Sequence, residues 1–294
     1  MSAYRFCRTD DMRRLVEALN ACWLPHFPGR APVTLADFKR DIRERHVWCS
    51  SCMIAFDGSE PIGVMIGAKR PHATLIAAIA VRPDRMRQEH GRHLIESLSA
   101  KLEILGPKRM IAEIPESQPE AMAFFEACGF TREATLTDWV LESGTGLGGP
   151  AQGGGAPEAD SGRFLVPVTV ADLVANRLLD SRPEAAWDRE AATLQARADR
   201  LSGVGLATVD RIEAFVLHRP TTEPGGGATI DAVGPTGVAR GDDLRRLLES
   251  VLKTVGAPLR IRRLAGAELP TEWLTAWGFR PSGATFRMTQ TARG

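Results

Sequence analysis

A glycine-rich segment near the middle of the chain limits what it can fold into. Residues 143–162 read SGTGLGGPAQGGGAPEADSG, which offers almost nothing to bury and has no hydrophobic period. This composition is typical of a flexible linker. The 294 residues are enough for two domains of ordinary size. We therefore predict an N-terminal domain over residues 1–142, a linker over residues 143–162 and a C-terminal domain over residues 163–294.

The two halves of the sequence resemble each other. Residues 94–98 (LIESL) have a counterpart in residues 247–251 (LLESV), 153 positions later. Residues 127–132 (ACGFTR) have one in residues 276–281 (AWGFRP), 149 positions later. Similar hairpins begin at Ile54 and at Leu206, 152 positions apart. The period is too long for a solenoid and indicates a duplicated domain.

The pattern of apolar residues gives the order of elements in the first half. A short strand over 3–7 precedes a helix that Asp10 or Asp11 can cap. The later elements are strands over 52–56 and 61–68, joined at Asp57-Gly58, a continuous apolar strand over 73–82, a helix over 91–105, a strand over 109–114, a helix over 119–128 and a last strand pair ending near residue 142. This order predicts an α/β (α+β) fold, with two tandem domains that each have a central mixed β-sheet flanked by helices.

Composition and charge narrow the class of protein. Apolar residues make up 44% of the chain and charged residues 25%, as in soluble globular proteins. The net charge of +1 gives no overall field that would attract nucleic acid or an anionic membrane, and no apolar run approaches the ~18 residues of a membrane helix. The polar start does not read as a signal peptide, and an odd number of cysteines, five, argues against a disulfide framework. We expect a cytoplasmic protein with neither a nucleic-acid nor a membrane partner.

The first candidate site follows the apolar strand. Residues 79–94 (IAVRPDRMRQEHGRHL) read as a strand end, a turn and the start of a helix. Backbone N–H groups at a helix N-terminus bind anions, and a glycine lets a phosphate approach the backbone. The segment contains Ile79, Ala80 and Val81 on the strand and Arg87, Gln88, Glu89, His90, Gly91 and Arg92 at the helix start.

The second candidate site lies in residues 109–130 (RMIAEIPESQPEAMAFFEACGF), a strand followed by a helix. Glu113 lies on the strand and Phe125 on the helix.

Residues 79–94 resemble the GCN5-related N-acetyltransferase (GNAT) family, which writes this segment as V-x-P-x-x-[R/Q]-x-x-G-x-[G/A]. The matching residues are Val81, Pro83, Asp84 and Gly91, whereas Met86 replaces the usual Arg or Gln and Glu89 replaces the usual Gly. The resemblance implies acetyl-CoA as co-substrate, with its pyrophosphate on the helix N-terminus. The candidate cofactor-binding residues are then those named above, Ile79 to Val81 on the strand and Arg87 to Arg92 at the helix start. A carboxylate at residue 89 would repel that pyrophosphate unless it points to solvent or pairs with Arg85 or Arg92.

Residues 109–130 resemble, without a gap, the GNAT pattern L-x-x-E-V-x-x-S-N-x-x-A-x-x-F-Y-E-x-x-G-F of the protein α-amino acetyltransferases that modify ribosomal-protein N-termini. The matching residues are Glu113, Ser117, Ala121, Phe124, Glu126, Gly129 and Phe130. The resemblance implies that Glu113 is the general base, which takes the proton from the amine directly or through water. It also implies that Phe125 contacts the cofactor. Phe125 replaces the tyrosine that protonates the departing thiolate, and the only tyrosine of this chain is Tyr4.

The second half departs further from the family. Its loop, residues 233–244 (VGPTGVARGDDL), lacks the [R/Q]-x-x-G-x-[G/A] pattern, and Asp242 and Asp243 would themselves occupy the helix start. Leu274 falls at the position of Phe125, and nothing clearly matches Glu113. We expect a structural or substrate-shaping copy. Nothing completes a ligand set around His72, His90 and His93, so we expect no metal.

Two functional hypotheses follow. In the first, the N-terminal domain is an N-acetyltransferase that moves an acetyl or other short acyl group from acetyl-CoA to an amine by direct attack, with a small molecule or a peptide as acceptor. In the second, the chain is a non-catalytic tandem GNAT protein that binds coenzyme A or other proteins. Either a monomer with pseudo-dimeric halves or a homodimer fits the duplication.

Overall fold

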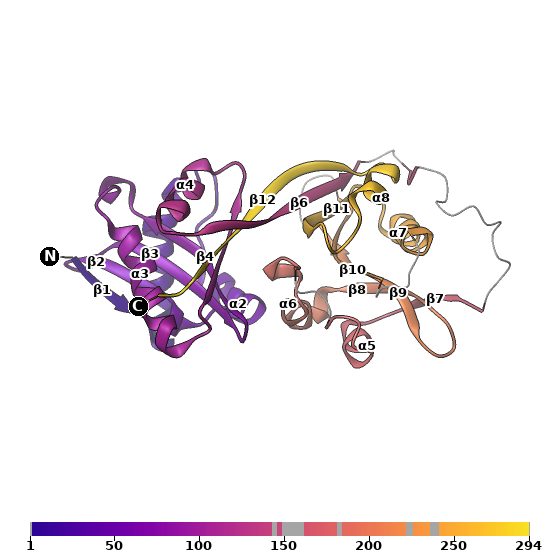
Figure 1. Cartoon of the computed structure of the whole chain (residues 1–294), viewed down its shortest axis with the longest axis horizontal. Helices are drawn as coiled ribbons and strands as arrows, with labels where there is room; N and C mark the ends of the chain where they lie inside the picture. Colours follow the sequence, from indigo (N-terminus) through magenta and orange to yellow (C-terminus); the bar gives the residue numbers. More distant parts are fainter. Residues whose placement is uncertain are drawn as a thin grey trace. The chain divides into compact units, whose positions relative to one another are not determined.

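The computed structural model describes residues 2–142, 146–148, 162–180, 184–221, 226–235 and 241–293 (Figure 1). Its helices are α1 (Met12–Ala18), α2 (Leu35–Arg45), α3 (His90–Leu105), α4 (Pro119–Ala127), α5 (Val170–Ala175), α6 (Ala191–Ala196), α7 (Gly241–Val255) and α8 (Thr271–Ala276). Its strands are β1 (Ser2–Phe6), β2 (Met53–Asp57), β3 (Glu60–Arg70), β4 (Ala73–Val81), β5 (Arg109–Pro115), β6 (Thr131–Leu141), β7 (Phe164–Pro167), β8 (Ser202–Ala207), β9 (Ile212–Pro220), β10 (Ala228–Pro235), β11 (Leu259–Ala265) and β12 (Arg280–Thr291).

The chain folds into two compact units that are not continuous halves of the sequence. The first unit contains Met1–Ala134 together with Phe286–Gly294, and the second contains Thr135–Thr285. The strands β6 and β12 therefore each contribute residues to both units. Of the predicted linker, residues 143–145 and 149–161 lie outside the described residues.

The sheet of the first unit runs in the order β1-β2-β3-β4-β5-β12. Its strands are antiparallel from β1 to β4, and β4 runs parallel to β5. The predicted hairpin is confirmed, since Asp57 pairs with Glu60 across a turn in which Gly58 has a φ of +60°. The left-handed conformation of that turn explains why glycine suits it.

Helices cover both faces of this sheet. On one face, the apolar side of α3 packs with alternate residues of the strands, such as Leu94 against Met65 in a shared buried cluster. The intervening residue Val64 is also fully buried, and α1 contacts β3. Because successive strand residues point to opposite faces, β3 is buried on both. In the described part of the chain, no helix is long and apolar enough to cross a membrane.

The predicted last strand pair of the first half is wrong. The structure has one long strand, β6, and its residues from Thr135 onward belong to the second unit. The reason lies in their apolar side chains: Trp139 and Leu141 are buried in a core cluster of the second unit. The place beside β5 is taken instead by β12, whose Phe286 and Met288 enter the core of the first unit.

The second unit repeats the pattern of the first. Its strands run in the order β6-β11-β10-β9-β8-β7, with β10 and β11 parallel and β7 to β10 antiparallel. The duplicated Gly-Phe landmark also repeats in conformation, since Gly129 has a φ of +87° and Gly278 a φ of +90°. The expected fold class, mixed sheets flanked by helices, is thus confirmed.

Candidate active site

The loop after β4 has an unusual backbone. Arg87 has a φ of +59° and Glu89 a φ of +63°, so two residues other than glycine adopt the left-handed conformation just before α3. Glu89 is the N-terminal cap residue of α3 in this conformation. A left-handed L-residue costs roughly 1–2 kcal/mol. The loop therefore keeps a backbone suited to glycine at the position where the sequence motif expects one.

The Glu89 carboxylate is exposed and paired with an arginine. Its side chain is 76% exposed, and it accepts a 2.7 Å hydrogen bond from Nε of Arg92. Of the two partners expected for Glu89, the structure selects Arg92. Arg85 pairs with Asp57 at 2.8 Å instead. Arg87 is exposed and makes no ion pair within the described ranges.

The first turn of α3 presents backbone donors. The hydrogen bond from the His93 amide to the Glu89 carbonyl, 3.0 Å long, is the start of the helical ladder. The amides of His90, Gly91 and Arg92 precede it, so they remain available to an anion. Gly91 also allows α4 to approach, because a Cβ there would lie 3.0 Å from the Phe124 ring.

The side chain of His90 is committed to the protein interior. It is buried, and its Nδ1 lies 2.5 Å from the hydroxyl of Tyr4 on β1. The ring of His93 lies 3.9 Å from the Tyr4 ring. Burial raises the pKa of the Tyr4 hydroxyl. These contacts hold the start of α3 against β1.

Among the described residues, no group of three or more His, Cys, Asp or Glu side chains could hold a metal ion.

The parallel strands β4 and β5 separate soon after they meet. They pair only at Thr74 and Leu75, opposite Met110 and Ile111. The register of β4 with β3 shifts at the same level, which leaves Ala77 as a bulge residue. From Ala77 to Val81 the strand is half-buried, whereas its first four residues are buried. In the described first unit, one edge of β4 is therefore without a strand partner at Ile79, Ala80 and Val81.

Glu113 lies on the β5 side of this separation, two residues beyond the last paired position. Its side chain is 4% exposed, and its Oε1 is 3.3 Å from Nη2 of Arg287. Arg287 lies on β12, so the C-terminal strand supplies the partner of the candidate base. No pattern in the first half of the sequence announces this arginine. Catalysis by Glu113 stays a prediction.

The other candidates occupy separate places. Gln88 is exposed beside Arg87. Phe125 is 4% exposed and packs edge-on against Phe124 and Phe130, with ring centroids 5.3 and 5.0 Å away, so its contact with a cofactor stays a prediction. Sequence reasoning did not single out the 2.8 Å hydrogen bond that Nε2 of His26 donates to the carbonyl of Val81, at the end of β4.

Comparison with known proteins identifies the first unit. A sequence model of the acetyltransferase (GNAT) family matches residues 12–130. These residues form a GNAT domain. No curated protein sequence matches the chain.

Solved structures extend the likeness to the whole chain. A tandem GNAT protein from the clavulanic acid biosynthesis pathway aligns with a TM-score of 0.63 and 17% identity, over 100% of this chain and 99% of that one. A GCN5-related N-acetyltransferase from Sphaerobacter thermophilus aligns with a TM-score of 0.62 and 15% identity, over 100% and 96%. A GCN5-related N-acetyltransferase from Anabaena variabilis aligns with a TM-score of 0.69 and 11% identity, over 100% of this chain and 73% of that one. At these identities the likeness shows the fold, and it confirms the expected tandem GNAT architecture.

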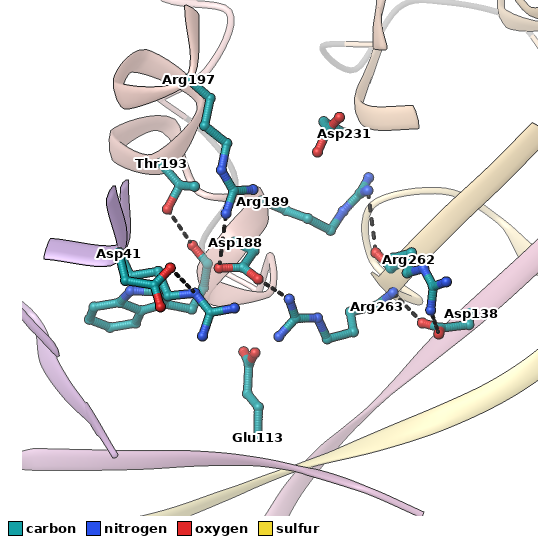
Figure 2. Close-up of polar contacts among 12 residues, drawn as sticks. Asp41, Glu113, Asp138, Asp188, Arg189, Thr193, Arg197, Asp231, Arg262 and Arg263 are labelled. Carbon is teal, nitrogen blue, oxygen red and sulfur yellow. Dashed lines mark hydrogen bonds and ion pairs between the residues drawn. The ribbon is translucent and has the colours of Figure 1, made fainter. Parts of the chain in front are cut away.

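In the second GNAT-like copy, a side chain fills the space where the two parallel strands separate. There β10 pairs with β11 only from Ala228 to Ile230, and Asp231 is the bulge residue, as Ala77 is in the first copy. Unlike the half-buried end of β4, residues 231–234 are buried. Within this unit Arg189 fills the gap. Its Nη1 donates to the carbonyl of Ile230 (3.0 Å) and to that of Arg262 (3.4 Å), and Figure 2 shows the second of these contacts.

The start of α7 is also occupied in the second copy. Asp242 and Asp243 lie in its first turn, and Asp243 pairs with Arg163 at 3.0 Å. Residues 236–240 of the corresponding loop lie outside the described residues. Leu274 on α8 is fully buried. Where the first copy offers free backbone donors, the second places carboxylates, which disfavour an anion.

Proposed function

We propose that the first unit transfers an acetyl group from acetyl-CoA, its co-substrate, to an amine of a small molecule or a peptide. The observation that carries this proposal is the separation of β4 from β5 beside the N-terminus of α3, within a domain of the acetyltransferase family. The second copy, closed by Arg189, would act as a supporting domain.

Acetyl-CoA has the right chemistry for this region. Its pantetheine arm is an extended chain with two amides, which can pair with the unpartnered edge of β4 as an added strand would. Its pyrophosphate suits the amides of residues 87–92, where backbone donors and the helix dipole favour negative charge. The Glu89 carboxylate is exposed and paired with Arg92, which lessens its repulsion of the pyrophosphate.

The transfer proceeds in one addition and one elimination. The amine nitrogen attacks the thioester carbonyl carbon, the new C–N bond forms, and the C–S bond then breaks. A backbone N–H of β4 near Val81 stabilises the oxyanion, and the bulge at Ala77 turns backbone groups out of the ladder. The ammonium proton passes to Glu113, directly or through water. The thiolate takes a proton from water, because Phe125 cannot donate one.

Calorimetric titration with acetyl-CoA tests the cofactor step. The full-length chain should bind with a micromolar dissociation constant. Glu89→Gln removes the charge but keeps a side chain in the left-handed position, whereas Glu89→Gly also relieves the backbone. Both should bind as tightly or several-fold more tightly, and Lys253→Ala on α7 should not differ from the native chain. No binding by any of the four would exclude acetyl-CoA as the co-substrate.

Thiol release with a panel of amines tests the chemistry. Glu113→Gln should lower turnover by about 10²–10⁴-fold while acetyl-CoA still binds. Because this variant leaves a buried arginine without its carboxylate, the double variant Glu113→Gln with Arg287→Met serves as a folding control. If acetyl-CoA binds and no amine gives turnover, the chain is a coenzyme A-binding or protein-interaction module instead.

A further inference from the structure

The segment that follows α1, residues 20–33, is fastened beside the end of β4. Its two ends are joined by Asn20, whose side-chain amide donates to the carbonyl of Val33 and whose Oδ1 accepts from the Val33 amide, both at 2.9 Å. Between these ends, Nε2 of His26 donates to the carbonyl of Val81 at 2.8 Å. The segment is therefore held at the strand edge where acetyl-CoA is proposed to bind.

Two aromatic rings of this segment hold an arginine. The ring centroids of Trp23 and Phe27 lie 4.3 Å apart. The guanidinium carbon of Arg30 lies 5.4 Å from the Trp23 centroid and 5.2 Å from that of Phe27. A cation within about 6 Å of a ring centroid is attracted to the face of the ring. The Arg30 amide also donates to the Phe27 carbonyl at 3.1 Å, so backbone and side chain both keep this arginine at the aromatic pair.

The guanidinium group of Arg30 still has hydrogen-bond donors to offer. Arg30 is exposed, whereas both rings are half-buried. Contact with the rings uses the face of a planar guanidinium group and leaves the N–H donors at its edge. Within the described residues Arg30 makes no ion pair with a carboxylate, whereas Arg82 at the end of β4 pairs with Asp84 at 2.6 Å. Such a group can bind the two oxygens of an anion through parallel hydrogen bonds.

We propose that the acceptor is an amine that also carries an anionic oxygen group, a carboxylate or a phosphate, and that Arg30 binds this group. The inference rests on the proposed acetyl transfer, because it assigns the acceptor of that reaction. His26 joins the segment to Val81, near which the thioester would be held. Arg30 can therefore bind one end of the acceptor while the amine at the other end reaches the thioester. Trp23 and Phe27 act as positioning residues, because they orient Arg30.

Thiol release from acetyl-CoA by the full-length chain tests this assignment with matched amines. Glycine, 4-aminobutyrate and 6-aminohexanoate place a carboxylate at increasing distance from the amine. Each is compared with its neutral amide and with the phosphonate of the same chain length. We expect at least one anionic amine to have a higher kcat/KM than its amide, mainly through a lower KM. Preference for the carboxylate or for the phosphonate assigns the anionic group, and turnover without preference for either over the amides overturns the proposal.

Variants of Arg30 connect the preference to this side chain. Arg30→Met should lower the ratio of kcat/KM for the anionic amine over its amide by about fivefold or more, because it removes the charged donors. The ratio cancels differences in reactivity between the two amines. Arg30→Lys should restore part of the preference, since it keeps the charge but not the planar group. Arg13→Met, which changes an exposed arginine on α1, is the matched control and should keep the native ratio. An unchanged ratio in Arg30→Met overturns the proposal.

Calorimetry separates a failure of this inference from a failure of the acetyl transfer itself. Turnover without an anionic preference overturns the role of Arg30 and leaves the acetyltransferase function standing. If no amine gives turnover, the same amines are titrated into the chain without acetyl-CoA. Saturable binding of an anionic amine that Arg30→Met abolishes supports the site, and absence of such binding overturns it.

Discussion

Arg189, which fills the space between β10 and β11, should contribute several kcal/mol to the free energy of unfolding of the second unit. Arg189 and Glu268 are each 4% exposed and pair at 3.0 Å. Arg189→Met keeps most of the side-chain volume but leaves a buried carboxylate without this guanidinium group. The Ala265 amide, 3.2 Å from Oε1 of Glu268, still donates to that carboxylate. It also strips a donor from the carbonyls of Ile230 and Arg262. Breaking a buried ion pair by removing one partner costs about 3–5 kcal/mol.

The double variant separates the charge from the hydrogen bonds. Arg189→Met with Glu268→Leu removes both charges, and such replacements are often neutral or stabilising. The single and the double variant both lose the Arg189 donor to these two carbonyls, at about 1–3 kcal/mol for each group, so this cost is common to both variants. We therefore expect the double variant to be more stable than the single one, with a favourable coupling of about 2 kcal/mol between the two residues.

Urea unfolding combined with hydrogen exchange on peptides of β10 and β11 makes the measurement. Exchange locates the loss in the second unit even if the two units unfold separately. Arg245→Met is the control, because its half-buried pair with Glu249 joins residues one helical turn apart on α7, and such pairs contribute only about 0.5 kcal/mol or less. A cost below about 1 kcal/mol for Arg189→Met, or a double variant as unstable as the single, would refute the role assigned to Arg189.

Four further predictions concern other parts of the chain. Glu89→Gly should be more stable than Glu89→Ala by about 1 kcal/mol in urea unfolding, because residue 89 is left-handed; equal midpoints would contradict that conformation. Tyr4→Phe removes the 2.5 Å hydrogen bond to His90 and should cost about 0.5–1.5 kcal/mol, with faster exchange in the first turn of α3; unchanged exchange would count against it. Burial raises the pKa of Asp231, so the folded chain keeps a proton that the unfolded chain has lost; this stabilisation is present below the unfolded pKa and is lost as the pH rises through the folded pKa. Asp231→Asn should flatten the pH dependence of stability above about pH 4, and an unchanged profile would argue against it. Burial raises the pKa of Cys7 to about 12 and that of Cys22 to about 11, so neither should react with an aromatic disulfide near neutral pH until the chain unfolds. Cys128 is half-buried, so it should be the thiol that labels fastest in the folded chain, and this signal should be absent from Cys128→Ser. Fast labelling of Cys7 would contradict the burial of that side chain.

Local sequence signals predicted most of the first unit. A few adjacent residues are enough to predict three of its features: the Asp57-Gly58 turn, the apolar strand β4 and the apolar face of α3. The loop before α3 was recognisable from the motif, and the left-handed backbone at Glu89 was expected from the glycine of that motif and not from glutamate itself. Short sequence patterns predict these features because each feature depends on hydrogen bonds and packing between segments that are adjacent in the sequence.

The contacts around the two candidate sites could not be predicted in the same way. Arg287 meets Glu113 across 174 positions of sequence, because β12 takes the place expected for a local strand. A strand that pairs locally and one that pairs at long range have the same period-two pattern, so periodicity does not reveal the exchange. Arg189 lies in a short 3₁₀ turn, Trp187–Arg189, where no pattern separates a buried arginine from a surface one.

The two copies show how a separated pair of parallel strands can be accommodated in two ways. Backbone groups at such a separation must find partners in a ligand, in water or in the protein. In the first copy the free edge of β4 stays half-buried, and in the second Arg189 supplies donors to Ile230 and Arg262. We infer that a copy without a ligand at this separation needs a side chain that supplies donors, as Arg189 does here. A charged residue in this position also brings a counterion with it, Glu268.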